Sequence, residues 1–203
     1  MAQEKQDAET KIKEAARRVF LTQGYEGAKM RQIAEEADVN LAMINYYFRS
    51  KEQLFNSIYA ETFGQFIGQV MQLINEPTPL EVKIWKIVDR YTDFLIDNPL
   101  VPSFILSKQR VNGGEFFKDM DVRGQIEKSV FKKQLVEEAE KGNIRLTDPL
   151  QVITAILGCL VFPIMAQQVV SYVGGLDEAG FREFMESRKQ FVPEMIMAYL
   201  KSG

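Results

Sequence analysis

Apolar residues recur with helical spacing through the beginning of the chain, and this periodicity limits the possible folds more than any other feature. A first helix is predicted over 12–20, and it ends at Gly24 because glycine adopts the left-handed conformation that follows a last helical turn. A second short helix is predicted over 30–37 and a third over 41–47. A fourth begins near Ser50, where a glutamine three residues later completes a capping-box pattern.

Proline, glycine and asparagine divide the remaining chain into further helices. The clearest break is 75–79, which holds two prolines and no apolar run. Asp148 and Pro149 are typical of a helix start, with Asp as N-cap and Pro at the first helical position. Pro163 is expected to kink the helix that follows. The chain is therefore predicted to be all-α, with C-terminal helices over 80–97, 101–111, 115–141, 149–173 and 177–200.

Two residue types are scarce, and their scarcity excludes common chemistry. The chain has no histidine, which removes His-dependent triads, His metal ligands and the usual near-neutral general base. Its one cysteine, Cys159, excludes an intrachain disulfide and a multi-cysteine zinc site. Asp89, Asp93 and Asp97 share a helix face, but without partners this spacing is typical of a solvated face. We expect no enzyme activity, catalytic residue, metal or cofactor.

The charge distribution does not by itself indicate a nucleic-acid binder. The net charge is −3, and residues 1–60 carry nine basic and nine acidic side chains. Binding to DNA would therefore depend on where the basic residues lie. The uncharged run 155–166 is too short to span a bilayer, and no secretory signal is visible. A cytoplasmic location without a membrane partner is expected.

The segment 30–47 meets the requirements of a helix-turn-helix. Two short helices flank a tight connection, and Asn40 suits the N-cap of the second helix. The side chains expected to face inward are Ile33, Ala34, Ala37, Val39, Ile44 and Phe48. Those expected to face outward are Leu41, Ala42, Met43, Asn45 and Tyr46. Such a face could meet thymine methyl groups, and Asn45 could pair with adenine through N6 and N7.

The same region carries a longer combination of residues, and this combination resembles the tetracycline-repressor (TetR) family closely. It covers about 45 of the 203 residues. The matching residues are Ile12, Ala15, Ala16, Phe20, Gly24-Tyr25, Met30-Arg31-Gln32-Ile33-Ala34-Glu35-Glu36-Ala37, Val39-Asn40 and Asn45-Tyr46-Tyr47-Phe48-Arg49-Ser50-Lys51-Glu52-Gln53-Leu54-Phe55. Three positions depart from the family's common residues: Ala28 replaces threonine, Asn45 replaces tyrosine and Tyr47 replaces histidine.

The resemblance implies an all-α homodimer with a three-helix DNA-binding head and a C-terminal domain that senses a ligand and dimerises. We expect the head over 1–50, a connecting helix and linker over 51–79, and the sensing domain over 80–203. The resemblance places Lys29, Tyr47 and Lys51 near phosphates. It places Arg31, Leu41, Ala42, Met43, Asn45 and Tyr46 near bases or the adjacent backbone.

Each of these side chains also has a plainer interpretation. Lys29, Arg49 and Lys51 could be solvated charges, and Tyr47 or Met43 could be packing residues. Arg31 could pair with the glutamate one turn later, an ion pair that stabilises a helix by a few tenths of a kcal/mol.

The two C-terminal helices have more apolar surface than one protomer needs. The helix over 149–173 is apolar nearly all round, so a partner chain could cover one side, although an internal core is the alternative. The residues expected at the dimer interface are Ile153, Leu157, Leu160, Ile164, Phe184, Phe191 and Met195. Aromatic residues over 80–175 are numerous enough to line a pocket, although they are more often core. The candidate ligand-binding residues are Trp85, Tyr91, Phe94, Ile105, Gln109, Phe131 and Phe162.

The leading hypothesis is a ligand-responsive transcriptional regulator that acts as a homodimeric repressor on palindromic, double-stranded operator DNA. Its partners would be that DNA, a small-molecule effector of unidentified chemistry and a second copy of the chain. A helical adaptor protein with a vestigial DNA-binding head is the alternative, because an apolar outward face could also bind protein.

Overall fold

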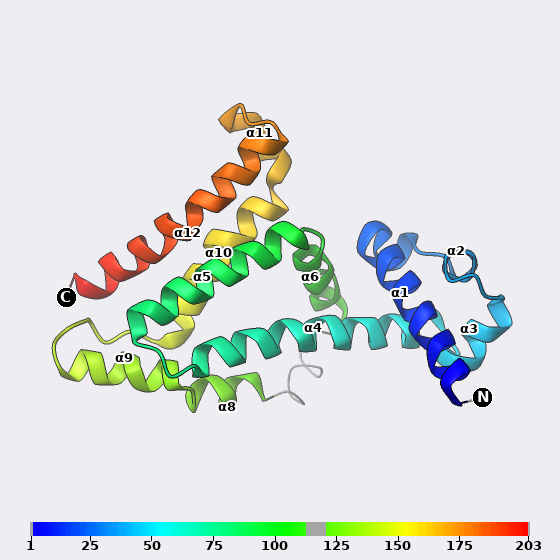
Figure 1. Ribbon diagram of the computed structural model, residues 1–203, viewed down its shortest axis with the longest axis horizontal. Helices are drawn as coiled ribbons and strands as arrows, with labels where there is room; N and C mark the ends of the chain where they lie inside the picture. The colour runs from blue at the N-terminus through cyan, green and yellow to red at the C-terminus, as the bar shows by residue number, and fades with distance from the viewer. Residues whose placement is uncertain (1, 113–120, 203) are drawn as a thin grey trace. The chain divides into compact units, whose positions relative to one another are not determined.

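The computed structural model describes residues 2–112 and 121–202, and side chains within 7–107 and 121–202 (Figure 1). These ranges contain helices joined by short connections and no strand, as the sequence predicts. The helices are α1 (Ala2–Gly27), α2 (Met30–Glu36), α3 (Leu41–Phe48), α4 (Lys51–Asn75), α5 (Leu80–Asp97), α6 (Val101–Asn112), α8 (Val122–Glu127), α9 (Val130–Glu140), α10 (Pro149–Met165), α11 (Gln167–Gly174) and α12 (Glu178–Lys201).

The chain forms two compact units, and the division between them runs through α4. One unit comprises Met1–Phe66 with Ser103–Asn112, and the other comprises Ile67–Pro102 with Gly113–Gly203. The predicted boundaries at 50 and 79 assigned α6 to the C-terminal domain, whereas α6 belongs almost entirely to the N-terminal unit.

The N-terminal unit is built around aromatic side chains from α1, α4 and α6. The ring of Phe55 contacts that of Phe20 edge-on, with 5.0 Å between the ring centroids, and that of Tyr25 at 4.9 Å. Gly24 has φ of +68°, so it interrupts α1 and lets the chain turn before Tyr25. The predicted end of the first helix at this glycine is therefore confirmed.

Helix α6 is held in this unit by a buried polar contact as well as by ring packing. Phe104 lies 5.3 Å from Phe55 and 5.7 Å from Tyr59, centroid to centroid. The Tyr59 hydroxyl donates a hydrogen bond of 3.0 Å to the carbonyl oxygen of Ile105. Burial raises the pKa of Tyr59, so this phenol remains a donor at neutral pH.

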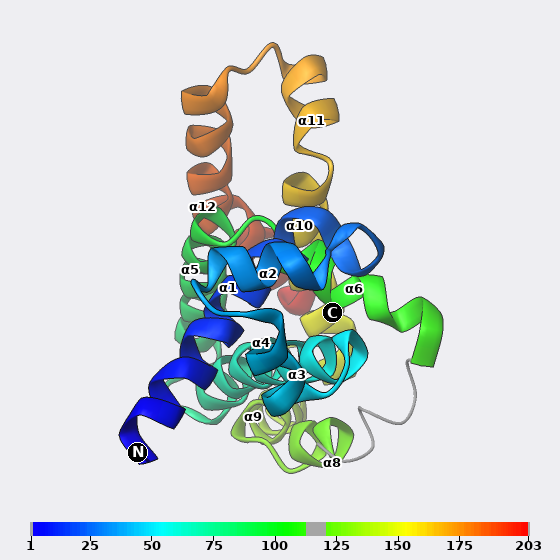
Figure 2. The ribbon, with the colours of Figure 1, turned by 90° about the vertical axis from the view of Figure 1, so that its right-hand side faces the viewer.

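The C-terminal unit packs α5 against α9, α10 and α12 (Figure 2). The inward stripe of α5 recurs with helical spacing, and α12 contributes a matching stripe. The apolar core residues of these two helices are Leu80, Ile84, Ile87, Val88, Tyr91, Leu95, Phe181, Met185, Val192, Ile196, Met197 and Leu200.

Two predicted helices are each divided in the structure. The segment predicted as one helix over 115–141 contains α8 and α9 in its described part, because the Ser129 hydroxyl accepts a hydrogen bond from the backbone N–H of Lys132 and starts a new helix. The segment 149–173 breaks at Ala166, three residues after Pro163, and α11 leaves α10 at an angle of 79°.

No single described helix is long and apolar enough to cross a membrane. By length and composition alone, the bent pair of α10 and α11 is the one combination of described helices that passes that test.

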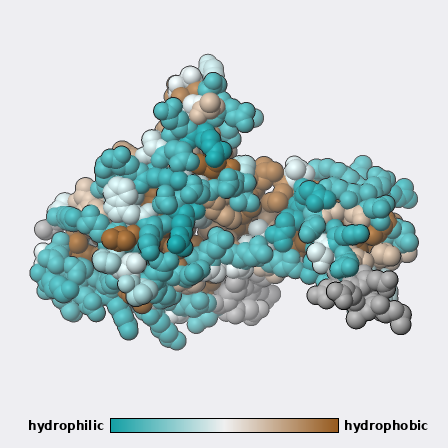
Figure 3. All heavy atoms as spheres, viewed as in Figure 1, coloured by the Kyte–Doolittle hydropathy of each residue, from teal (hydrophilic) through white to brown (hydrophobic). Residues whose placement is uncertain are grey.

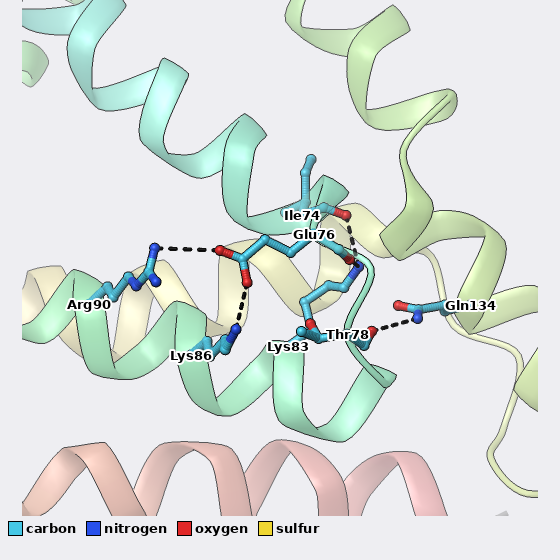
Figure 4. A network of polar contacts seen from close by, with 7 residues as sticks. All are labelled: Ile74, Glu76, Thr78, Lys83, Lys86, Arg90 and Gln134. Carbon is cyan, nitrogen blue, oxygen red and sulfur yellow. Dashed lines mark hydrogen bonds and ion pairs between the residues drawn. The ribbon is translucent and has the colours of Figure 1, made fainter.

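A buried lysine stabilises the C-terminal end of α4 (Figure 4). Lys83 of α5 is fully buried, and its ammonium group donates to the carbonyl oxygens of Ile74 and Glu76 at 3.2 and 2.6 Å. The Glu76 carboxylate binds Lys86 at 2.8 Å and lies 3.5 Å from Arg90. Burial lowers the pKa of Lys83, while Glu76 opposes that shift. A cation here offsets the negative end of the α4 dipole.

Replacing Lys83 with methionine tests this interaction. The change keeps the side-chain length but removes both hydrogen bonds, which destabilises the fold. It also removes the desolvation cost of a buried charge, which offsets part of that loss. We expect the free energy of unfolding to fall by about 1–3 kcal/mol. Lys86→Met is the control, because loss of that more exposed ion pair should cost less than about 1 kcal/mol. Urea unfolding followed by circular dichroism measures both, and equal losses would contradict the role assigned to Lys83.

Candidate nucleic-acid interface

Helices α2 and α3 form a helix-turn-helix whose turn is fixed by local hydrogen bonds. Asp38 has φ of +53°, and the next backbone N–H, that of Val39, donates to the Ala34 carbonyl oxygen at 3.0 Å. The Asn40 side chain accepts a hydrogen bond of 2.8 Å from the Met43 N–H, which confirms the predicted N-cap. The inward residues are buried except for half-buried Val39.

The opposite side of α3 is open to solvent. Ala42, Met43, Asn45 and Tyr46 are exposed, and Tyr46 is 69% exposed. Leu41 and Tyr47 are half-buried, and Tyr47 packs edge-on against Tyr46 with ring centroids 5.3 Å apart. The predicted outward face is therefore present, with Leu41 at its edge. Tyr47 combines a packing contact with partial exposure, so the two sequence interpretations of this residue are compatible.

Four basic side chains close in sequence to this face have no acidic partner among the described residues. Lys29 precedes α2, Arg31 lies in its first turn, and both are exposed. Lys51 begins α4, where its ammonium lies 4.6 Å from the centroid of the Tyr25 ring. Within the described residues Lys29, Arg31, Arg49 and Lys51 form no ion pair, so the alternative pairing of Arg31 with Glu35 is not made.

The basic residues of α1 are arranged differently. Lys13 binds Glu61 at 2.7 Å and Glu9 at 3.1 Å, and hydrogen bonding to Glu61 raises the pKa of Lys13. Arg17 lies 3.2 Å from Glu61, and Arg18 lies 2.5 Å from Glu36. These ion pairs therefore join α1 to α4 through Glu61 and to α2 through Glu36. The basic residues next to α2 and α3 have no acidic partner among the described residues, so they remain available to an anionic partner.

The predicted ligand-binding residues do not form one pocket. Phe131 is fully buried, Phe162 is 65% exposed, and Ile105 belongs to the N-terminal unit. Tyr91 and Phe94 stack on α5, and burial raises the pKa of Tyr91 far above its usual value. Trp85 is half-buried and lines a groove of about 570 Å³ between α5 and α12. The side chain of Gln109 lies outside the described residues.

A second hollow lies elsewhere in the C-terminal unit and was not predicted. It measures about 640 Å³, and Ile96, Ile164, Phe181 and Met185 supply apolar lining next to the polar Arg182. Its walls come from the end of α5, the junction of α10 with α11, and the start of α12. No sequence signal indicated it, because its lining residues come from segments distant in the chain.

Two of the predicted dimer-interface residues face the protomer's own core. Leu160 is fully buried and Ile164 is 6% exposed, so we leave both out of any interface. Ile153, Leu157 and Phe184 are half-buried, whereas Phe191 and Met195 are exposed. The error arose because α10 is apolar nearly all round, so periodicity cannot tell which of its sides faces the core.

The acidic face of α5 is not simply solvated. Lys189 of α12 binds Asp93 at 2.5 Å and lies 3.4 Å from Asp89. Burial lowers the pKa of Lys189, but hydrogen bonds to Asp93 and Glu186 outweigh it and raise the pKa overall. These carboxylates join α5 to α12. Among the described residues, no cluster of three or more Asp, Glu, Cys or His side chains could hold a metal ion.

Comparison with known proteins agrees with this geometry. The family model "Bacterial regulatory proteins, tetR family" matches residues 12–58, from α1 into α4. The chain is 27% identical over 168 residues to "Probable HTH-type transcriptional regulator YttP" of Bacillus subtilis (strain 168), covering 80% of each chain. It is 29% identical over 145 residues to the HTH-type transcriptional repressor AcnR of Corynebacterium efficiens, covering 70% of this chain and 71% of that one.

The fold extends the match beyond the helix-turn-helix. The transcriptional regulator FadR from Bacillus subtilis, solved in complex with stearoyl-CoA, superposes with a TM-score of 0.58 at 21% identity. The alignment covers 94% of this chain and 98% of that one, so both units take part. Residues 12–58 therefore carry the helix-turn-helix region of the TetR family of bacterial regulatory proteins, and the chain is similar over most of its length to DNA-binding transcriptional regulators.

Proposed function

We propose that this protein is a ligand-responsive repressor that binds a palindromic operator as a homodimer through the exposed face of α3. The observation that carries the proposal is the combination of this open face with basic residues, before and in α2 and at the start of α4, that have no acidic partner among the described residues. Lys29, Arg31 and Lys51 would contact phosphates, which fix position and orientation. Asn45 and Tyr46 would then reach base edges in the major groove.

The ligand response would travel through α6. This helix follows directly from the C-terminal unit in sequence, yet Phe104 packs on two aromatic residues of α4 next to the helix-turn-helix. A ligand that shifts α6 would disturb that packing and so change the affinity of α3 for DNA, a coupling typically worth about 1–3 kcal/mol. The stearoyl-CoA bound by the Bacillus subtilis FadR supports a small-molecule effector.

The dimer would form on the outer side of α12 together with α10. Phe184, Phe191, Met195 and Tyr199 follow one another at spacings of seven, four and four along α12, on a side distinct from its buried stripe. Arg188 lies over the rings of Phe184 and Phe191, and its Nε donates to the Cys159 carbonyl oxygen at 2.8 Å. Two heads related by a two-fold axis would read half-sites about 34–36 Å apart, or a multiple of that distance.

The phosphate role of Lys51 predicts a change in salt dependence. Lys51→Gln removes the ammonium group that lies over the Tyr25 ring and keeps a polar, uncharged side chain at this position. On the tightest-binding duplex selected from a random library, we expect the slope of log K against log salt to become shallower by about one unit. Lys133→Gln on α9 is the exposed control. Filter-binding titrations measure both; identical slopes for Lys51→Gln and wild type would remove Lys51 from the interface.

The base-reading role of Asn45 predicts a loss of specificity. Asn45→Ala should cost about 1–3 kcal/mol on the selected duplex and little on a scrambled duplex of equal length. Gln72→Ala, an exposed amide on α4, is the control and should change neither affinity. Equal losses on the two duplexes would show that Asn45 does not read a base.

The dimer predicts that one exposed apolar residue controls DNA binding at a distance. Phe191→Asp should give monomers, because the carboxylate would be buried without a partner, and operator affinity should fall although α3 is intact. Val82→Asp changes an exposed valine of α5 and should leave a dimer. Sedimentation equilibrium gives the oligomeric state. A wild-type monomer that binds its duplex with full affinity would refute the dimer.

A further inference from the structure

Helix α11 projects from the C-terminal unit and carries apolar side chains that the described residues of this unit leave exposed. In Figures 1 and 2, α11 lies beyond the other helices of this unit, at the end of α10 and α12 away from the C-terminus. We call the segment from Phe162 to Gly175 the arm. Its exposed large residues are Phe162, Met165, Val169, Tyr172 and Val173, and Tyr172 is 89% exposed. Figure 3 shows hydrophobic residues on this projection among hydrophilic ones.

The arm is an ordered element rather than a loose loop. Gly175 has φ of +62° and closes α11, and the Leu176 N–H donates to the Ser171 carbonyl oxygen at 2.9 Å. Asp177 then caps α12 by accepting a hydrogen bond of 2.8 Å from the Gly180 N–H. The exposed apolar residues therefore have a fixed arrangement, with successive spacings of three, four and three from Phe162 to Tyr172.

The chemistry of the arm selects the kind of partner. No Asp, Glu, Lys or Arg occurs from Pro149 to Leu176, and the polar residues of α11 are Gln167, Gln168 and Ser171. A helix that lies on a membrane surface usually carries Lys or Arg on its polar face, and a nucleic acid needs cations. Neither a membrane surface nor a nucleic acid therefore suits the uncharged arm. An apolar surface of another protein chain suits it.

The apolar area exposed on α12 indicates which protein surface covers the arm. A stable interface buries about 800 Å² on each partner, and large apolar side chains cover about 150–250 Å² each when fully exposed. Phe191, Met195 and Tyr199 of α12 are exposed by 55, 38 and 51%, so they supply only about 300 Å². The five apolar residues of the arm add about 600 Å² by the same reckoning. The arm would therefore contribute about twice as much apolar area to the proposed dimer as these residues of α12 do.

The chain also offers a surface for the arm to meet. The outer side of α12 has a shallow hollow of about 390 Å³ lined by Phe184, Arg188 and Phe191. The arm and the hollow belong to the same hairpin of α10 and α12. In a dimer with two-fold symmetry, the arm of each copy would face the hollow of the other. We propose that the arm closes over the second copy of this chain, with Tyr172 as its central anchor; this inference rests on the homodimer proposed above.

The test uses the full-length protein with three residues truncated together. Val169→Ala, Tyr172→Ala and Val173→Ala keep helix propensity and change exposed positions, so the fold should be retained, which a thermal melt checks. We expect the dimer dissociation constant to rise about 30-fold or more by sedimentation equilibrium. The matched control is Val82→Ala with Leu100→Ala, two other exposed apolar residues of this unit, which should leave the constant unchanged.

A second measurement reports directly on covering of the arm. Val173→Cys in a Cys159→Ser background places the only thiol on the arm, and Val82→Cys in the same background places it on α5. Dilution below the dimer dissociation constant should speed maleimide labelling at position 173 at least several-fold and leave position 82 unchanged. Equal rates at both concentrations would overturn the proposal.

The outcomes separate the arm from the dimer itself. If wild type and the triple variant dimerise equally while Phe191→Asp is monomeric, the arm proposal fails and the dimer stands. If wild type is monomeric throughout, both fail. If wild type sediments with vesicles of phosphatidylglycerol and phosphatidylethanolamine and the triple variant does not, while their dimerisation is the same, the arm binds membrane and the proposal is wrong.

Discussion

The packing of Phe104 against Phe55 and Tyr59 is the interaction on which the functional architecture depends. It joins α6 to α4 across more than forty residues of sequence, and the Tyr59 hydroxyl fixes the register by bonding to Ile105. Aromatic pairs of this kind contribute about 0.5–1.5 kcal/mol each beyond the area they bury. These ring contacts and the Tyr59 hydrogen bond hold α6 in the unit that carries the helix-turn-helix.

Much of the N-terminal unit could be predicted from the sequence because its determinants are local. Gly24, Asn40 and the apolar spacing of α2 and α3 each act within a few residues, and the structure shows all three as expected. Which basic residues would remain unpaired was not predictable, because Arg17 and Arg18 find their acidic partners on other helices.

The C-terminal unit was predicted less well, and the reasons are physical. Ser129 starts a new helix within a charged segment that reads as continuous, since serine is only mildly unfavourable inside a helix. The position of α6 depends on ring contacts between distant segments. On α10 the apolar residues occupy every side, so Leu160 and Phe162 look alike in sequence although the first is buried and the second exposed. Lys83 gave no sign that it would be buried, because its two acceptors are backbone carbonyls.

The separation of charge within the N-terminal unit has a consequence for how the protein approaches a polyanion. A chain with net charge −3 is repelled by nucleic acid on average. A local attraction can still arise near Lys29, Arg31 and Lys51, because the potential close to a surface depends mainly on the nearest charges. In the binding mode proposed above, this local attraction would favour encounters in which α3 faces the DNA.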